Sequence, residues 1–166
     1  MLLRVTTMTQ RPPVTPAIRA LRAAGVAYEP YLYDYEQFPG AVGAAEFIGI
    51  DPGLTAKTIV LATSDDTGVV VLMNGDREIS TKAVARLLGV KQTRPASQRE
   101  ADRWTGYQFG GTSPLGLRTS LPILAQQEVA DLETVYVNAG SRGFVIGMNA
   151  KTLIELCAAT IVDVSA

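Results

Sequence analysis

The sequence predicts a mixed α/β fold (α+β mixed), a single domain with one curled, mixed β-sheet flanked by helices. Apolar runs rich in β-branched residues alternate with amphipathic segments of helical period, and most helical segments carry recognisable end signals. The order of strands and helices follows no strict β–α–β rhythm, which favours a mixed sheet. At 166 residues, 47% hydrophobic and 19% charged, the chain has the size and composition of a single globular domain.

The first three elements are expected to be helix, strand and helix. A Thr-Pro start, an apolar stripe and a final glycine predict a helix over residues 15–25. Residues 28–35 alternate in polarity as a strand does, and a second helix over residues 41–48 is expected to stop at Gly49. The strand places three aromatic residues on one face: Tyr31, Tyr33 and Tyr35.

The middle of the chain predicts a buried hairpin followed by two helices. Residues 58–62 and 69–73 are apolar and rich in β-branched residues, and a polar stretch separates them, as in two paired strands. Ser80 is a typical N-cap for a helix that ends before Gly89. Residues 97–106 contain a Ser-x-x-Glu capping box and a terminal glycine, which predicts a short helix.

The last part of the chain begins with a glycine-rich segment. Residues 106–116 contain four glycines in eleven positions, and we expect them to lie between two apolar strands, 107–109 and 121–125. A second strand pair, a helix and a final strand complete the prediction, at 134–137 with 144–146, 149–157 and 161–164.

Composition excludes several kinds of chemistry. The chain has no histidine and a single cysteine, so a Ser-His-Asp or Cys-His nucleophile and an internal disulfide are both ruled out. We therefore expect no metal and no other cofactor. Cys157 lies on an apolar helix and is interpreted as a buried structural thiol.

Charge and hydropathy limit the cellular location and the binding partners that the sequence predicts. A net charge of −1 disfavours nonspecific nucleic-acid binding through a global field. We see no signal peptide and no apolar run of membrane length, which predicts a cytoplasmic protein with no membrane contact. Residues 1–13 are expected to form a flexible tail, and residues 14–166 the single domain.

Lys57 and the glycine-rich segment are the candidate site. Glycines allow a backbone to approach a ligand and to point its N–H groups at a phosphate or an oxyanion, although a wide bulged turn has the same composition. Lys57 precedes a buried run, where its ammonium could bind a phosphate or a carbonyl oxygen, or remain solvated. Arg142 is either a phosphate contact or a turn cation. The tyrosine face could stack a base or a ribose, or simply pack across strands.

Together these segments resemble the YbaK/EbsC family of aminoacyl-tRNA editing proteins, from residue 15 to about residue 164. Each marker is weak alone, but their order and spacing are specific. The markers are Thr15-Pro16-Ala17, then Lys57-Thr58, then Thr105-Gly106-Tyr107 leading to Gly110-Gly111-Thr112-Ser113-Pro114-Leu115-Gly116, and finally Gly140-Ser141-Arg142-Gly143.

The resemblance implies a trans-editing deacylase that frees a wrongly attached amino acid from the 3′ end of tRNA, most typically cysteine from tRNA(Pro). In the family pattern, the lysine and the backbone of the loop hold the terminal adenosine and the aminoacyl ester. Prolyl-tRNA synthetase is an expected partner, because the modest charge suggests a weak grip on the tRNA body. The implied catalytic residue is Lys57, and the implied substrate-binding residues are Tyr33, Gly110, Gly111, Thr112, Ser113, Pro114, Gly116 and Arg142.

The expected chemistry needs no protein nucleophile, because an aminoacyl ester is already activated. For cysteine, the resemblance implies that the thiol of the substrate attacks its own ester. In one departure from the family pattern, Val145 and Gly147 stand where many members carry polar residues, the first of them acidic. Two alternatives stay open: a deacylase for alanine or serine, and a non-catalytic module that binds a nucleotide or an aminoacyl-tRNA end.

Overall fold

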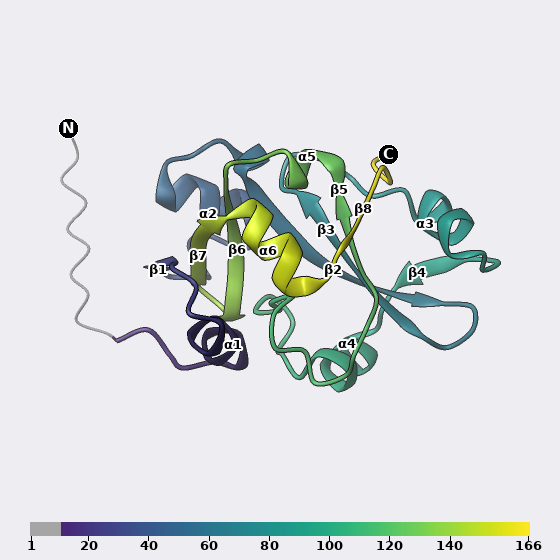
Figure 1. Cartoon of the computed structure of the whole chain (residues 1–166), viewed down its shortest axis with the longest axis horizontal. Helices are drawn as coiled ribbons and strands as arrows, with labels where there is room; N and C mark the ends of the chain where they lie inside the picture. The colour runs from purple at the N-terminus through teal and green to yellow at the C-terminus, as the bar shows by residue number, and fades with distance from the viewer. Residues whose placement is uncertain (1–10) are drawn as a thin grey trace.

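The computed structural model describes residues 11–166, so the predicted flexible tail over residues 1–13 falls mostly outside the described part. Helices and strands mix along the chain, with six α-helices and eight strands in residues 11–166 (Figure 1). The elements are α1 Pro16–Ala24, β1 Glu29–Leu32, α2 Gly40–Ile48, the 3-10 helix η1 Pro52–Leu54, β2 Thr55–Thr63, β3 Gly68–Asn74, α3 Thr81–Leu88, β4 Thr93–Pro95, α4 Gln98–Thr105, β5 Ile123–Gln126, α5 Gln127–Ala130, β6 Thr134–Ser141, β7 Phe144–Asn149, α6 Ala150–Cys157 and β8 Thr160–Val162.

All the strands join one mixed sheet, which confirms the predicted fold class. Their order is β1-β7-β6-β2-β3-β5-β8, and the short β4 pairs with β2 outside this path. The hairpins β2–β3 and β6–β7 are antiparallel, as are the pairs β1–β7 and β2–β4. Parallel pairing joins β2 to β6, β3 to β5 and β5 to β8.

The predicted helix ends are confirmed by their hydrogen bonds. The Thr15 hydroxyl oxygen accepts the Ile18 N–H at 3.2 Å, and Ser97 and Glu100 form the complete capping box. Gly25 and Gly89 end their helices in the left-handed conformation. These ends depend on a few neighbouring residues, which is why the sequence predicts them well.

Other parts of the chain differ from the prediction. The short elements β4 and α5 were not predicted, and residues 107–109 are not a strand, because Gly106 ends α4 and the chain then turns, with the Gly111 N–H donating to the Gln108 carbonyl at 2.8 Å. The first strand stops at Leu32 instead of residue 35. A turn begins at Asp34, whose carboxylate accepts the Glu36 N–H at 3.0 Å.

Helices cover the two faces of the sheet differently. Side chains from α1, α5 and α6 share the largest apolar cluster with the strands. On the other face α2 and α3 contribute to two separate clusters. Strand alternation in β7 follows this division, because Phe144 and Ile146 join the large cluster and Val145 joins the cluster of α2.

Candidate functional site

The candidate site lies where the sheet is interrupted beside β2. Along one edge of this strand, β6 pairs with Thr55 and Ala56, and β4 pairs with residues 61–63. Between them, residues 57–60 pair with no strand on that edge within the described chain, although all four pair with β3 on the other edge. A cavity of about 380 Å³ lies at this gap, a size typical of small-ligand sites.

The cavity walls are almost entirely uncharged. Residues of β2, β6 and β7 form part of the wall, and α2, α4, the end of β4, the turn after β1 and the glycine-rich loop supply the rest. Lys57 is the one charged residue among the described residues that line it, and Ile59, Val60 and Val145 supply much of its apolar surface. A small neutral group therefore suits this cavity better than a carboxylate or a bulky side chain.

The ladder pattern of β2 directs backbone polar groups into the gap. The Gly75 N–H donates to the Thr55 carbonyl and the Thr63 N–H to the Thr67 carbonyl, so the odd-numbered residues of β2 hydrogen-bond to β3. The even-numbered residues turn their N–H and carbonyl groups to the interrupted edge. There the Val60 carbonyl accepts the Ala96 N–H at 2.9 Å, and the backbone N–H and carbonyl of Thr58 face the cavity.

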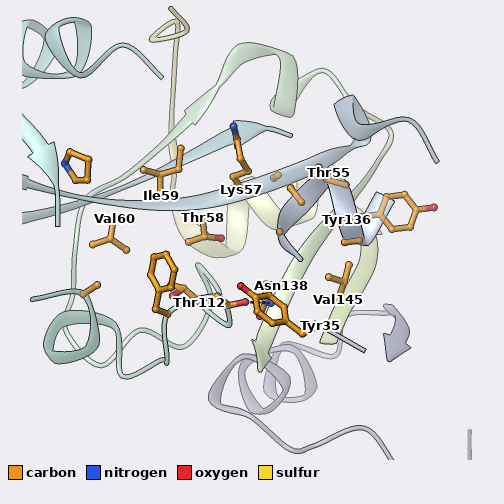
Figure 2. Close-up of a pocket in the computed structure, with 18 of the residues that line it drawn as sticks. Tyr35, Thr55, Lys57, Thr58, Ile59, Val60, Thr112, Tyr136, Asn138 and Val145 are labelled. Atoms are coloured by element: carbon orange, nitrogen blue, oxygen red, sulfur yellow. Dashed lines mark hydrogen bonds between the residues drawn. The ribbon is translucent and has the colours of Figure 1, made fainter. Parts of the chain in front are cut away.

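The Thr58 side chain is a candidate that the sequence indicated only as a neighbour of Lys57. Its hydroxyl oxygen is buried and has no hydrogen-bond partner among the described residues. Figure 2 shows the side chain pointing from β2 toward Thr112 and Asn138. Buried hydroxyls are nearly always hydrogen-bonded in folded proteins, so an unpaired one in a cavity wall is suited to a ligand contact.

Lys57 lines the same cavity, but its ammonium group is directed elsewhere. Nζ donates to the Arg77 carbonyl at 2.5 Å. In Figure 2 the side chain leaves β2 on the side opposite to Thr58, as strand alternation requires. The structure therefore places Lys57 at the cavity without bringing its ammonium to the glycine-rich loop. Its catalytic role stays a prediction.

Gly110 and Thr112 of the predicted loop residues also line the cavity, next to Phe109. Gly111 instead lies against the β6–β7 turn, where an added Cβ would come within 2.8 Å of the Arg142 backbone nitrogen. Gly116 likewise packs on α1, where a Cβ would lie 2.7 Å from the Pro16 carbonyl carbon. These two glycines serve the packing of the loop on the protein itself.

The Ser-Pro part of the loop is also internal. Ser113 is fully buried, and its hydroxyl oxygen accepts the Leu115 N–H at 3.2 Å. The Pro114 carbonyl accepts a weak hydrogen bond from the Cys157 thiol at 3.9 Å. Burial raises the pKa of this thiol to about 12, which supports the structural interpretation of Cys157. Neither Ser113 nor Pro114 belongs to the cavity wall as the structure has it.

Two polar side chains fix the loop over the cavity. Arg142 donates from Nε to the Phe109 carbonyl at 2.7 Å, and its guanidinium carbon lies 5.4 Å from the centre of the Tyr35 ring. Asn138 donates from Nδ2 to the Gly110 carbonyl at 3.3 Å. The predicted cation at this turn is thus brought to the loop and supports it.

Tyr33 lines the cavity, as expected, and packs on Phe47 with ring centres 5.2 Å apart. Burial, with a smaller contribution from Tyr35, raises the pKa of Tyr33 to about 12, so its hydroxyl stays protonated near neutral pH. Tyr31 instead packs against Tyr136, with 5.9 Å between ring centres. The three tyrosines therefore serve different contacts.

Over 11–166, no group of three or more His, Cys, Asp or Glu side chains is arranged to hold a metal ion. No described helix combines the length and apolar character needed to cross a bilayer.

Comparison with known proteins connects this geometry to a family. Residues 36–156 match the family model described as the aminoacyl-tRNA editing domain. A candidate Cys-tRNA(Pro)/Cys-tRNA(Cys) deacylase of Enterococcus faecalis, EbsC, is 29% identical, over 86% of this chain and 87% of its own length.

Other relatives match only over part of their length or only in fold. The proline–tRNA ligase of Ligilactobacillus salivarius is 36% identical over 62% of this chain, and the match spans 18% of the ligase. A crystal structure described as a candidate trans-editing enzyme for prolyl-tRNA synthetase superposes with a TM-score of 0.82. At 22% identity over 95% of this chain and 99% of the other, that likeness shows the fold alone.

Proposed function

The chain belongs to the aminoacyl-tRNA editing family, and we propose that it is a trans-editing deacylase that frees cysteine from mischarged tRNA(Pro). The name of the Enterococcus faecalis relative, which matches along nearly all of its length, supports this substrate. Alanine and serine esters are the competing substrates. The proposal takes residues 14–166 as one editing domain that acts in the cytoplasm.

The interrupted edge of β2 is the observation that carries the proposal. It provides a small neutral cavity with a buried hydroxyl, a free backbone N–H at Thr58 and one cation, Lys57, in its wall. An ester that is already activated needs positioning and polarisation of its carbonyl more than a protein nucleophile. One well-placed oxyanion donor lowers a barrier by about 2.7–4 kcal/mol.

The proposed chemistry uses groups of the substrate. The cysteine sulfur forms a bond to its own ester carbonyl carbon, the bond from that carbon to the ribose oxygen breaks, and the thiol proton passes to the ribose oxygen. For other amino acids, a water molecule held by the neighbouring ribose hydroxyl replaces the thiol. The protein holds the ester between β2 and residues 109–112. Cys157 takes no part, because it does not line the cavity and its thiol donates a weak hydrogen bond to the Pro114 carbonyl.

The apolar character of the cavity wall limits which aminoacyl group the protein can accept as a substrate. Val145 is 5% exposed and packs with Ala44 and Ile48, so the wall is apolar where many family members are expected to be acidic. Small neutral side chains fit such a wall, and discrimination between them amounts to about 1–3 kcal/mol per methylene. Because the net charge of the chain is −1, we propose that prolyl-tRNA synthetase holds the tRNA body.

The deciding experiment compares release of free amino acid from Cys-, Ala- and Ser-charged tRNA(Pro) by the protein and its Lys57→Ala variant. We propose that the Lys57 ammonium leaves the Arg77 carbonyl for the bound ester, so Lys57→Ala should fold normally and lose at least about 100-fold in rate, the effect of one lost oxyanion donor. Lys82→Ala, which changes an exposed lysine of α3, is the matched control and should retain full activity.

Full activity of Lys57→Ala would contradict the catalytic role of the lysine. Stoichiometric binding of intact aminoacyl-tRNA without turnover, by the unchanged protein, would replace the deacylase with a binding module.

A further inference from the structure

Phe109 is a large aromatic side chain left exposed at the rim of the cavity. It lines the cavity and is nevertheless 63% exposed, more than any other large hydrophobic residue described as exposed. Its loop is held in place, because its own carbonyl accepts from Arg142 and the next carbonyl, of Gly110, accepts from Asn138. A ring on a fixed loop is a preorganised contact surface, since little conformational entropy is lost when a ligand covers it.

The segment of chain that carries the Phe109 loop is locally basic. Residues 91–118, from just before β4 to just after the loop, contain five cations and two acids, a net of +3 in a chain of net −1. None of these cations lines the cavity, because the α4 residue in its wall is Ala101 and the neighbouring arginines project from the other side of the helix.

The turn that follows β1 lies beside the Phe109 loop, where Arg142 contacts both the Tyr35 ring and the Phe109 carbonyl. Asp34 and Glu36 flank Tyr35 in this turn. Phosphates close to this turn would be repelled, so the contact surface at this rim is the uncharged Phe109 ring.

The size of the cavity limits what it can hold. About 380 Å³ lies near the lower end of the range for small-ligand sites. An aminoacyl ester can occupy this space, but the nucleotides that continue the strand must leave it across the rim. Single-stranded nucleic acids are commonly bound by positive grooves in which exposed aromatic rings stack on the bases.

We propose that the single-stranded 3′ end of the tRNA leaves the cavity across the Phe109 loop, and that the Phe109 ring stacks on a base next to the aminoacylated nucleotide. The proposal rests on the proposed function for the identity of the RNA.

Binding of a fluorescein-labelled single-stranded RNA hexamer that ends in CCA tests the surface directly. Phe109→Ala should weaken binding about tenfold, Phe109→Trp should retain it, and Phe109→Leu, apolar but not aromatic, should behave like the alanine variant. Leu87→Ala, which changes an exposed apolar residue of α3, is the control and should bind normally.

Kinetics with the aminoacyl-tRNA substrate give a second readout. Phe109→Ala should raise KM about tenfold and leave kcat within about twofold, because stacking on a neighbouring base holds substrate and transition state alike. Hexamer binding that is equal in Phe109→Ala, Phe109→Leu and the unchanged protein would overturn the proposal. Phenylalanine-dependent hexamer binding without amino acid release would instead overturn the deacylase and retain the RNA surface.

Discussion

The two edges of β2 have opposite roles. Toward β3, seven consecutive residue pairs run without a break, from Ala56 opposite Asn74 to Ala62 opposite Gly68, and β3 is buried along its whole length. Toward β6 and β4, pairing stops for four residues and the strand becomes half-buried. The complete edge stabilises the strand, so the interrupted edge can expose polar backbone groups to a ligand without the loss of the strand.

The difference between the two edges of β2 is also seen in one pair of opposite residues in the β2–β3 ladder. Thr58 and Leu72 stand directly opposite each other on β2 and β3. Leu72 is fully buried in the main core, whereas the hydroxyl of Thr58 lies unpaired in the cavity wall. We therefore expect substitutions on the two strands to separate stability from activity.

The largest effect on stability is expected from Leu72→Ala. Loss of a fully buried leucine leaves a void, and we expect the free energy of unfolding to fall by about 2–5 kcal/mol. Chemical denaturation measures it. Below the unfolding transition the folded fraction should keep its deacylase activity. A loss of activity per folded molecule as large as that of Lys57→Ala would mean that the paired edge also belongs to the site.

A smaller effect is expected at the loop support. Asn138→Ala removes hydrogen bonds to the Gly110 and Ser141 carbonyls and from the Gly140 N–H, and should cost about 1–3 kcal/mol. Activity should fall further than stability, because the loop loses its fixed position over the cavity. The two quantities are measured by denaturation and by amino acid release at a temperature where the variant is folded.

Asn149→Ala is the matched control for the loop support. Asn149 caps α6 by accepting the Thr152 N–H at 3.0 Å, and its loss should cost about 1 kcal/mol without affecting activity. Equal activity losses in the two asparagine variants would show that the position of the loop has no special role.

The smallest effect on stability is expected from Thr58→Val. The hydroxyl has no partner in the described structure, so an apolar group of the same shape should be neutral or stabilising by up to about 1 kcal/mol. If the hydroxyl binds the ester, deacylation should slow by about tenfold. Thr58→Ser keeps the hydroxyl and should retain activity, and a fully active Thr58→Val would exclude a role for this group.

Sequence reasoning predicted the elements that depend on neighbouring residues. Capping residues such as Ser97 with Glu100, and terminal glycines such as Gly25, act within one turn of a helix, so their signals are complete in a short window. The family motifs likewise located the cavity wall at Lys57, Gly110 and Thr112. Gly111 and Gly116 were predicted to contact the ligand, but they pack against the protein itself. A glycine that allows close approach of a ligand and one that allows close approach of another part of the chain look the same in the sequence.

The sequence by itself determined the mixed fold, most helix ends and the segments that meet at the site, because hydrophobic period, capping and motif spacing are written in consecutive residues. Only the tertiary structure decided that β2 has an interrupted edge, that Lys57 donates to the Arg77 carbonyl, and that Thr58 faces the loop. These features depend on where β4 and β6 stop pairing, and the register between distant strands is set by the packing of the whole sheet.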